Sequence, residues 1–269
     1  MKPCISEATT LPCTFAEDVA AYAAAGFAGM EVWLTKLEKH LETHSLADTR
    51  KLLADRQLAP AAAAYQGGLL LSQGEQRRAH YDHFRTRLDL CQQLGVPTLL
   101  VVADFAGPID ATALERAVVS LTQAAQWAAG FNVRLALEFR GRDSFCASLD
   151  TALALALQCG EPNVGINFDV FHYYTGPSKL EDLDLLPPDR LFHVQLCDLA
   201  GTPRELATDS DRILPGDGDF RLGALLERLR ALGYDGWVSL ELMNPTLWHA
   251  KPAQVADVGL AALRSLLGS

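Results

Sequence analysis

Acidic or amide side chains follow apolar runs at four places in the second half of the sequence. Each run has the length and composition of a buried β-strand, and the polar residues near its carboxyl end are Glu138, Asp169, Gln195 and Glu241. A carboxylate at the end of an apolar strand is costly unless it is paired or binds a metal, and three converging carboxylates would repel one another. A divalent cation removes that repulsion, and these oxygen-rich ligands suit Mg²⁺ or Mn²⁺, with Co²⁺ as a third candidate. A lone carboxylate is more often a helix cap, but four such strand ends in succession predict one metal site.

Short apolar runs and longer amphipathic segments alternate along the chain. Eight runs are expected as strands, over residues 3–8, 29–34, 59–66, 98–103, 133–139, 164–170, 191–197 and 236–242. Helical spacing of apolar residues predicts helices over 15–25, 46–57, 75–94, 111–129, 147–159, 221–232 and 252–267, and a weak one over 179–186. Several of these helices end on glycine before the next strand, among them Gly95 and Gly130. The repeated βα units favour a parallel sheet. Their number and the chain length favour one closed (β/α)₈ TIM barrel that occupies residues 1–269 as a single domain.

The composition excludes several classes of protein. Hydrophobic residues make up 49% of the 269 residues, which is enough for a large core. The formal net charge of −10 argues against a nucleic-acid partner, because phosphate affinity comes from clustered Lys and Arg. No apolar stretch is long enough to cross a membrane, and the N-terminus lacks the apolar region of a signal peptide, so the cytoplasm is the expected location. The six cysteines have neither zinc-site nor redox spacing and are expected as reduced thiols, many of them buried.

Taken in order, five motifs resemble one family. They are Leu-Glu-Phe at 137–139, Phe-Asp-Val-Phe-His at 168–172, Phe-His-Val-Gln-Leu-Cys-Asp at 192–198, Arg-Ile-Leu-Pro-Gly-Asp-Gly-Asp-Phe at 212–220 and Ser-Leu-Glu-Leu at 239–242. Their order and spacing resemble the xylose-isomerase-like TIM barrels, also called the sugar phosphate isomerase/epimerase superfamily. Relatives include ketose 3-epimerases, hydroxypyruvate isomerase, inosose and 3-dehydroshikimate dehydratases and, more distantly, endonuclease IV.

The resemblance assigns roles to particular residues. It implies that Glu138, Asp169, Gln195 and Glu241 hold the metal. Many relatives have a His at the position of Gln195, and the glutamine form is associated with hydroxypyruvate isomerase and some dehydratases. His193 is expected in a hydrogen-bonded core position rather than as a ligand. The resemblance further implies that His172 and Arg212 contact the substrate. Glu31 and Trp33 of the second strand are candidates for the wall of the site, and Asp198 and Asp217 are expected to shape loops.

Glu138 and Glu241 are the expected catalytic pair. One would remove a proton next to a carbonyl that the metal polarises, and the other would return a proton to the resulting enediolate. This predicts an isomerase or epimerase of a keto-sugar or related hydroxy-carbonyl compound. Loss of a β-hydroxyl instead would give a dehydratase of an inosose-like or 3-dehydroshikimate-like substrate, and the sequence does not separate the two. A nuclease like endonuclease IV is disfavoured, because that family binds zinc through several histidines and this chain has few. A non-catalytic sugar-binding barrel is disfavoured by the presence of both Glu138 and Glu241.

A polyhydroxy carbonyl compound is the expected partner, with neither nucleic acid nor membrane. Barrels of this kind often form homodimers, and the long connection over residues 199–220 is expected to serve function, since long loops in compact domains usually do. A phosphate group on the substrate has no support, because no glycine-rich anion loop follows the final strands.

Overall fold

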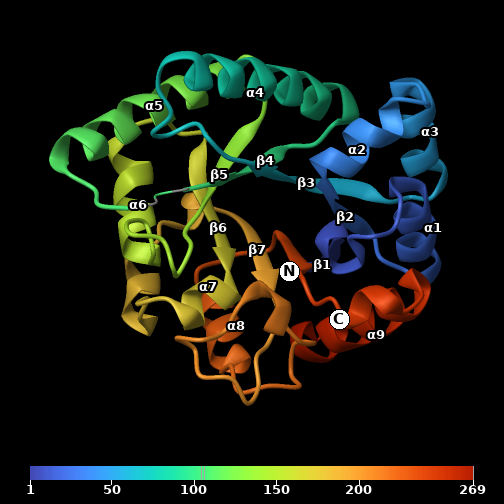
Figure 1. Cartoon of the computed structure of the whole chain (residues 1–269). Coiled ribbons are helices and arrows are strands. Elements are labelled where there is room, and N and C mark those ends of the chain that lie inside the picture. The colour runs from blue at the N-terminus through green and yellow to red at the C-terminus, as the bar shows by residue number, and fades with distance from the viewer. Residues whose placement is uncertain (104, 106, 269) are drawn as a thin grey trace. The chain divides into compact units, whose positions relative to one another are not determined.

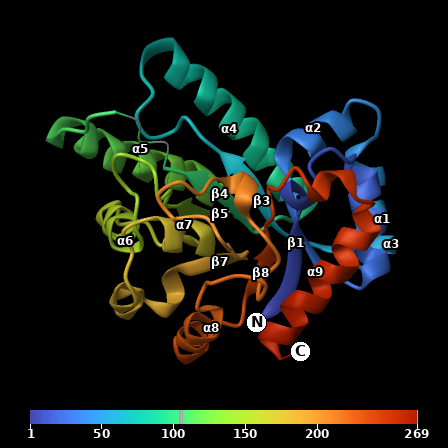
Figure 2. The ribbon, with the colours of Figure 1, turned by 60° about the horizontal axis from the view of Figure 1, so that its bottom comes forward.

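The computed structural model describes residues 1–103, 105 and 107–268. Its strands form a closed barrel in the order β1 to β8, so the predicted (β/α)₈ barrel is confirmed. Figure 1 labels β1 to β7, and Figure 2 labels β8. The strands are β1 (Lys2–Ser6), β2 (Gly29–Trp33), β3 (Ala59–Gln66), β4 (Thr98–Val102), β5 (Arg134–Glu138), β6 (Val164–Asp169), β7 (Leu191–Leu196) and β8 (Trp237–Leu240). Each lies within about two residues of its predicted range.

Helices follow the strands along the chain. The α-helices are α1 (Phe15–Ala25), α2 (Leu34–Leu41), α3 (Leu46–Asp55), α4 (Gly74–Leu94), α5 (Ala111–Ala129), α6 (Leu149–Gln158), α7 (Val170–Thr175), α8 (Leu222–Ala231) and α9 (Pro252–Leu267). Short 3₁₀ turns are η1 (Glu7–Thr10), η2 (Leu180–Leu185), η3 (Pro188–Arg190), η4 (Asp209–Asp211) and η5 (Leu247–His249). The weak helix expected near 179–186 is thus the 3₁₀ turn η2, and α2 and α7 were not predicted. None of the helices within the described residues is long and apolar enough to cross a membrane.

The chain divides into two compact units, and the first comprises residues 1–63 and 194–269. In this unit β1 pairs in parallel with both β2 and β8, and Ile5 lies opposite Met30 on one side and Leu240 on the other. All three side chains are fully buried. Helices α1 and α9 pack against each other, as the two views in Figures 1 and 2 show. The first and last βα elements therefore share one core.

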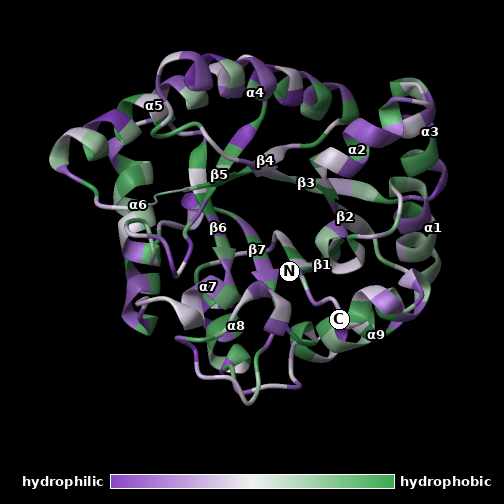
Figure 3. Ribbon diagram, in the orientation of Figure 1, coloured by the Kyte–Doolittle hydropathy of each residue, from purple (hydrophilic) through white to green (hydrophobic). Residues whose placement is uncertain are grey.

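The second unit comprises residues 64–193. Its strands β4, β5 and β6 are parallel neighbours, and Val102, Glu138 and Asn167 follow one another across the register. Residues 99–101 of β4 are fully buried, which confirms that both faces of this strand are covered. Figure 3 shows the matching pattern on α4, where hydrophilic and hydrophobic residues alternate around the helix. The borders between the units fall within β3 and β7, and the expectation of a single domain stays a prediction.

Local signals set several helix ends. Thr14 and Glu17 form a capping box at the start of α1, and Gly95 ends α4 in the left-handed conformation with φ of 79°. Gly130 also caps its helix, but it is right-handed, and the left-handed residue is Asn132, with φ of 56°. All six cysteines are free, and five of them are buried, so the expectation that many of them are buried is confirmed.

Candidate functional site

Three side chains with metal-binding groups gather at the carboxyl ends of β5 and β6. Glu138 is the last residue of β5, Asp169 is the last residue of β6, and His172 lies on α7. Oε1 of Glu138 and Oδ2 of Asp169 are each 3.6 Å from Nε2 of His172. The ligand atoms of all three residues lie within 4.8 Å of one another. We call these residues the β5–β6 cluster.

Backbone and side-chain donors orient the two carboxylates of the β5–β6 cluster. Asp169 both ends β6 and caps α7, because its Oδ1 accepts the backbone N–H of Phe171 at 2.8 Å. Asn167 donates its Nδ2 hydrogen to Oε2 of Glu138 at 3.0 Å. Each carboxylate thus receives a protein hydrogen bond on one oxygen and turns its other oxygen toward His172. Two carboxylate oxygens and one imidazole nitrogen form a set that can hold a divalent cation.

Burial strengthens the repulsion between the two carboxylates of the β5–β6 cluster. Asp169 is fully buried, and His172 and Glu138 are 8% and 9% exposed. Two carboxylates so close together in a low-dielectric interior repel each other unless positive charge balances them. Within the described residues, no other group of three or more His, Cys, Asp or Glu side chains has the spacing for a metal. The donor set and the charge of the cluster therefore both fit a bound cation.

A second cluster lies in the first unit, around Gln195 of β7. Its Nε2 donates to Oε1 of Glu31, on β2, at 3.0 Å and to Oε1 of Glu241, directly after β8, at 2.9 Å. The hydroxyl of Ser6 donates to the same oxygen of Glu31 at 2.8 Å. Glu31 is fully buried, Gln195 is 1% exposed and Glu241 is 5% exposed. We call Glu31, Gln195, Glu241 and Arg212 the β7–β8 cluster.

Arg212 supplies the positive charge of the β7–β8 cluster. Its Nη1 donates to Oε2 of Glu241 at 3.0 Å, and its Nη2 donates to Oδ1 of Asp209 at 2.7 Å. The Arg212 side chain is 1% exposed, although it lies in the long connection between β7 and α8. The guanidinium therefore joins this connection to the strand end that carries Glu241.

Asp198 shapes the connection that carries Arg212. Its carboxylate accepts the backbone N–H groups of Leu199, Gly216 and Phe220, each at 2.9 Å. A Cβ on Gly218 would lie 2.4 Å from Oδ1 of Asp198, so the loop wraps tightly around this carboxylate. The predicted loop role of Asp198 is confirmed.

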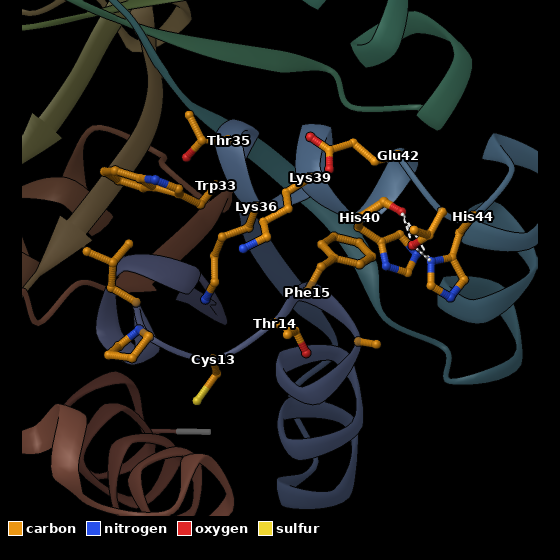
Figure 4. Close-up of a pocket in the computed structure, with 14 residues that line it drawn as sticks. Cys13, Thr14, Phe15, Trp33, Thr35, Lys36, Lys39, His40, Glu42 and His44 are labelled. Carbon is orange, nitrogen blue, oxygen red and sulfur yellow. Dashed lines mark hydrogen bonds between the residues drawn. The ribbon is translucent and has the colours of Figure 1, made fainter.

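A cavity of about 590 Å³ lies in the first unit between the segment before α1 and helix α2 (Figure 4). Its wall includes Phe15, Trp33, Lys36 and His40. The ammonium of Lys36 contacts the buried carboxylate of Asp18 and donates to the carbonyl of Thr10 at 3.0 Å. Trp33 thus lines a cavity beside the end of β2, whereas Glu31 points to Gln195.

A family model described as "xylose isomerase-like TIM barrel" matches residues 19–266. The chain belongs to this family. The sequence is 28% identical over 261 residues to an inosose isomerase of Bacillus velezensis, and the match covers 91% of this chain and 89% of that protein. It is 29% identical over 262 residues to a 3-dehydroshikimate dehydratase of Pseudomonas aeruginosa, of which the match covers 40%.

The solved structure described as IOLI protein with a binding zinc atom has the same fold as this xylose isomerase-like chain. The TM-score is 0.94 at 24% identity, and the alignment covers 100% of this chain and 98% of that one. The zinc atom belongs to the structure of that protein. The fold is therefore shared along the whole length.

The structure places the predicted site residues of this family member in two groups. Glu138, Asp169 and His172 come together in the second unit, and Gln195, Glu241 and Arg212 come together in the first. The combination of four of them in one metal site stays a prediction. His193 is 1% exposed and does not belong to the metal-binding group found among the described residues.

Sequence reasoning missed two hydrogen-bond partners of the candidate site residues. Asn167 donates to Glu138, and Asp209 accepts from Arg212. A signal for Asn167 was present, since an amide within an apolar strand and two residues before Asp169 points to the same face of the sheet. Asp209 gave no such signal, because it lies in an irregular segment.

Proposed function

We propose that this protein is a divalent-metal-dependent isomerase or epimerase of a keto-sugar or related hydroxy-carbonyl compound. The observation that carries the proposal is the β5–β6 cluster, where two buried carboxylates and an imidazole lie within 4.8 Å of one another. The resemblance to inosose isomerases over nine-tenths of the chain supports this reaction class. A substrate of this kind is a small polyhydroxy carbonyl compound.

We further propose that the metal is held by Glu138, Asp169, Gln195 and Glu241. These residues lie at or beside the carboxyl ends of four strands that are consecutive in the barrel order. Active sites of (β/α)₈ barrels form at that end of the strands. Three carboxylates and an amide oxygen favour Mn²⁺ or Mg²⁺, and Co²⁺ and Zn²⁺ belong in the same test. When bound, the metal would polarise the substrate carbonyl and acidify the adjacent C–H.

Glu138 and Glu241 are the proposed acid–base pair. One carboxylate takes the proton from the carbon beside the carbonyl, and the other delivers a proton to the enediolate, on the opposite face for epimerisation or on the neighbouring carbon for isomerisation. Hydrogen bonds from Asn167 to Glu138 and from Arg212 to Glu241 hold each carboxylate in one orientation. His172, 8% exposed beside Glu138, is the proposed contact for a substrate hydroxyl.

A dehydratase is the second candidate, and one specific observation favours it. The 3-dehydroshikimate dehydratase of Pseudomonas aeruginosa matches 96% of this chain at 29% identity. One glutamate of the same pair would remove the proton as a carboxylate, and the enolate would then expel the β-hydroxyl, which leaves as water with a proton from the other glutamate in its protonated form. The two reactions share their first step and differ in the fate of the enolate.

Deuterium exchange tests the shared step and separates the two reactions. Metal-stripped and Mn²⁺-loaded protein would be incubated in D₂O with ketoses, inososes, hydroxypyruvate and 3-dehydroshikimate, and products read by proton NMR. We expect metal-dependent deuterium at the carbon beside the carbonyl, which Glu241→Gln abolishes. Glu227→Gln, an exposed position on α8, is the matched control and should retain exchange. A protein that binds no stoichiometric metal would contradict the proposal.

The proposal extends to location and assembly. A cytoplasmic homodimer fits an enzyme of small metabolites, and we expect size-exclusion chromatography with light scattering to give twice the chain mass of 29.2 kDa. A monomer would remove the dimer from the proposal and leave the chemistry unchanged.

A further inference from the structure

Glu31 is a buried carboxylate to which the proposed reaction gives no role. It lies on β2, it is fully buried, and two side chains donate to its Oε1 atom. These donors are the hydroxyl of Ser6 at 2.8 Å and Nε2 of Gln195 at 3.0 Å. A buried carboxylate is costly to retain, so its specific contact with a proposed metal ligand calls for a functional explanation.

We propose that Glu31 is a positioning residue that fixes which way the amide of Gln195 faces, in the orientation needed for its oxygen to bind the metal. The inference rests on the proposed function, because it takes Gln195 as a metal ligand. An amide presents an acceptor oxygen on one side and two donor hydrogens on the other, so only one of its two orientations can bind a cation.

The neighbours of Gln195 select that orientation. Nε2 donates to Glu31 and to Glu241, and both acceptors are carboxylate oxygens, at 3.0 and 2.9 Å. Turning the amide over would place its carbonyl oxygen against these two oxygens, where no hydrogen is available and the partial charges repel. Each of the two amide hydrogens therefore has a carboxylate partner, and Oε1 points away from Nε2. Partners of this kind orient metal ligands and tune their affinity in many proteins.

The contact with Ser6 indicates that the position of the Glu31 Oε1 atom, rather than the charge of the carboxylate, orients Gln195. The Ser6 hydroxyl donates to the same Oε1 atom that accepts from Gln195, which holds this oxygen in position. A Gln at position 31 carries a carbonyl oxygen that can accept both hydrogen bonds without a negative charge. An Asp keeps the charge but sets the carboxylate back by one methylene. The two substitutions therefore separate position from charge.

The test measures Mn²⁺ affinity by calorimetry on metal-stripped protein. We expect Glu31→Gln to bind Mn²⁺ within about threefold of the wild type and Glu31→Asp to bind it about 10- to 100-fold more weakly. The inference is overturned if Glu31→Gln binds as weakly as Glu31→Asp or more weakly, or if Glu31→Asp binds as tightly as the wild type. Both changes are small, and circular dichroism of each variant confirms that the fold is retained.

Two further measurements separate this inference from the proposed function. Gln195→Ala should weaken Mn²⁺ binding at least as much as Glu31→Asp does. If it leaves the affinity unchanged while Asp169→Asn lowers it, Gln195 is not a ligand, the inference fails and metal dependence stands. If the wild-type protein binds none of Mn²⁺, Mg²⁺, Co²⁺ and Zn²⁺, the proposed function itself fails.

Discussion

Replacing Arg212 by Met tests how the charge of Glu241 is balanced. The Arg212 side chain is 1% exposed, and its Nη1 donates to Oε2 of Glu241 at 3.0 Å. Its Nε and Nη2 donate to Oδ1 of Asp209 at 3.1 and 2.7 Å. Met keeps an apolar stem of similar length but supplies neither charge nor donor. The variant therefore removes the guanidinium from a carboxylate that stays buried.

The contacts of Arg212 determine how much stability the variant loses. Removing one partner of a buried ion pair costs about 3–5 kcal/mol. Arg212→Met belongs at the lower end, because Gln195 still donates to Glu241 at 2.9 Å. The Asp209 side chain is 38% exposed, so water replaces most of its interaction with the guanidinium. We expect the free energy of unfolding of the metal-free protein to fall by about 3 kcal/mol.

A metal at Glu241 would restore positive charge and recover part of this loss. If about 1.4 kcal/mol is recovered, linkage requires the variant to bind the metal about tenfold more tightly than the wild type. Urea unfolding in chelator and in saturating Mn²⁺, together with calorimetric titration, measures both quantities. Arg204→Met, at an exposed ion pair with Glu205, should change the stability by less than about 0.5 kcal/mol. An equal loss of stability in both conditions, or a weaker affinity for Mn²⁺, would refute the reasoning.

Three further predictions concern the loop, a buried carboxyl group and the β5–β6 cluster. Gly218→Ala should destabilise the fold by about 1–3 kcal/mol in urea unfolding, since its Cβ would lie 2.4 Å from Asp198, whereas Gly223→Ala, with open space around it, should not. Burial raises the pKa of Glu7 well above 4.5, so the folded state binds the proton more tightly than the unfolded state. The protonated carboxyl group of Glu7 contributes its full stability below pH 4.5, and this contribution is lost as the pH rises through the raised pKa. The free energy of unfolding of Glu7→Gln, relative to the wild type, should therefore increase with pH, by at most about 1.4 kcal/mol per pH unit. His172→Ala should lower kcat/KM about 100-fold with Mn²⁺ stoichiometry unchanged, and loss of the metal would make His172 a ligand instead.

The strands could be predicted because each is a short apolar run between amphipathic segments. Helices α2 and α7 escaped prediction for a physical reason, since no loop with a separate cap precedes either of them. Helix α2 starts directly after Trp33, which makes no side-chain cap, and Asp169 serves as the last residue of β6 and the cap of α7. Prediction from sequence places helix boundaries at loops and capping residues, so a helix that follows its strand directly is assigned to the strand.

The candidate site was predictable in its residues and not in its contacts. A polar residue at the end of an apolar strand is visible in the sequence, as Glu138 and Asp169 show. The partners of these residues depend on tertiary structure, because Gln195 and Glu31 are 164 positions apart. The expected contact of Arg212 with substrate stays a prediction, and its ion pair with Glu241 was not predicted. Side-chain identity and spacing alone do not encode such pairs.

The two clusters balance their acidic charge in different ways, and this suggests a division of roles. Glu241 accepts a hydrogen bond from the charged guanidinium of Arg212 at 3.0 Å, whereas the donors to Glu138 and Asp169 are the neutral amides of Asn167 and Phe171. Glu138 and Asp169 share one imidazole nitrogen at 3.6 Å, which is longer than a charge-assisted hydrogen bond. A cation therefore relieves more repulsion at Glu138 and Asp169 than at Glu241. Under the proposed function, metal affinity should depend mainly on the β5–β6 carboxylates, and Glu241 is the better placed of the two glutamates to exchange a proton without releasing the metal.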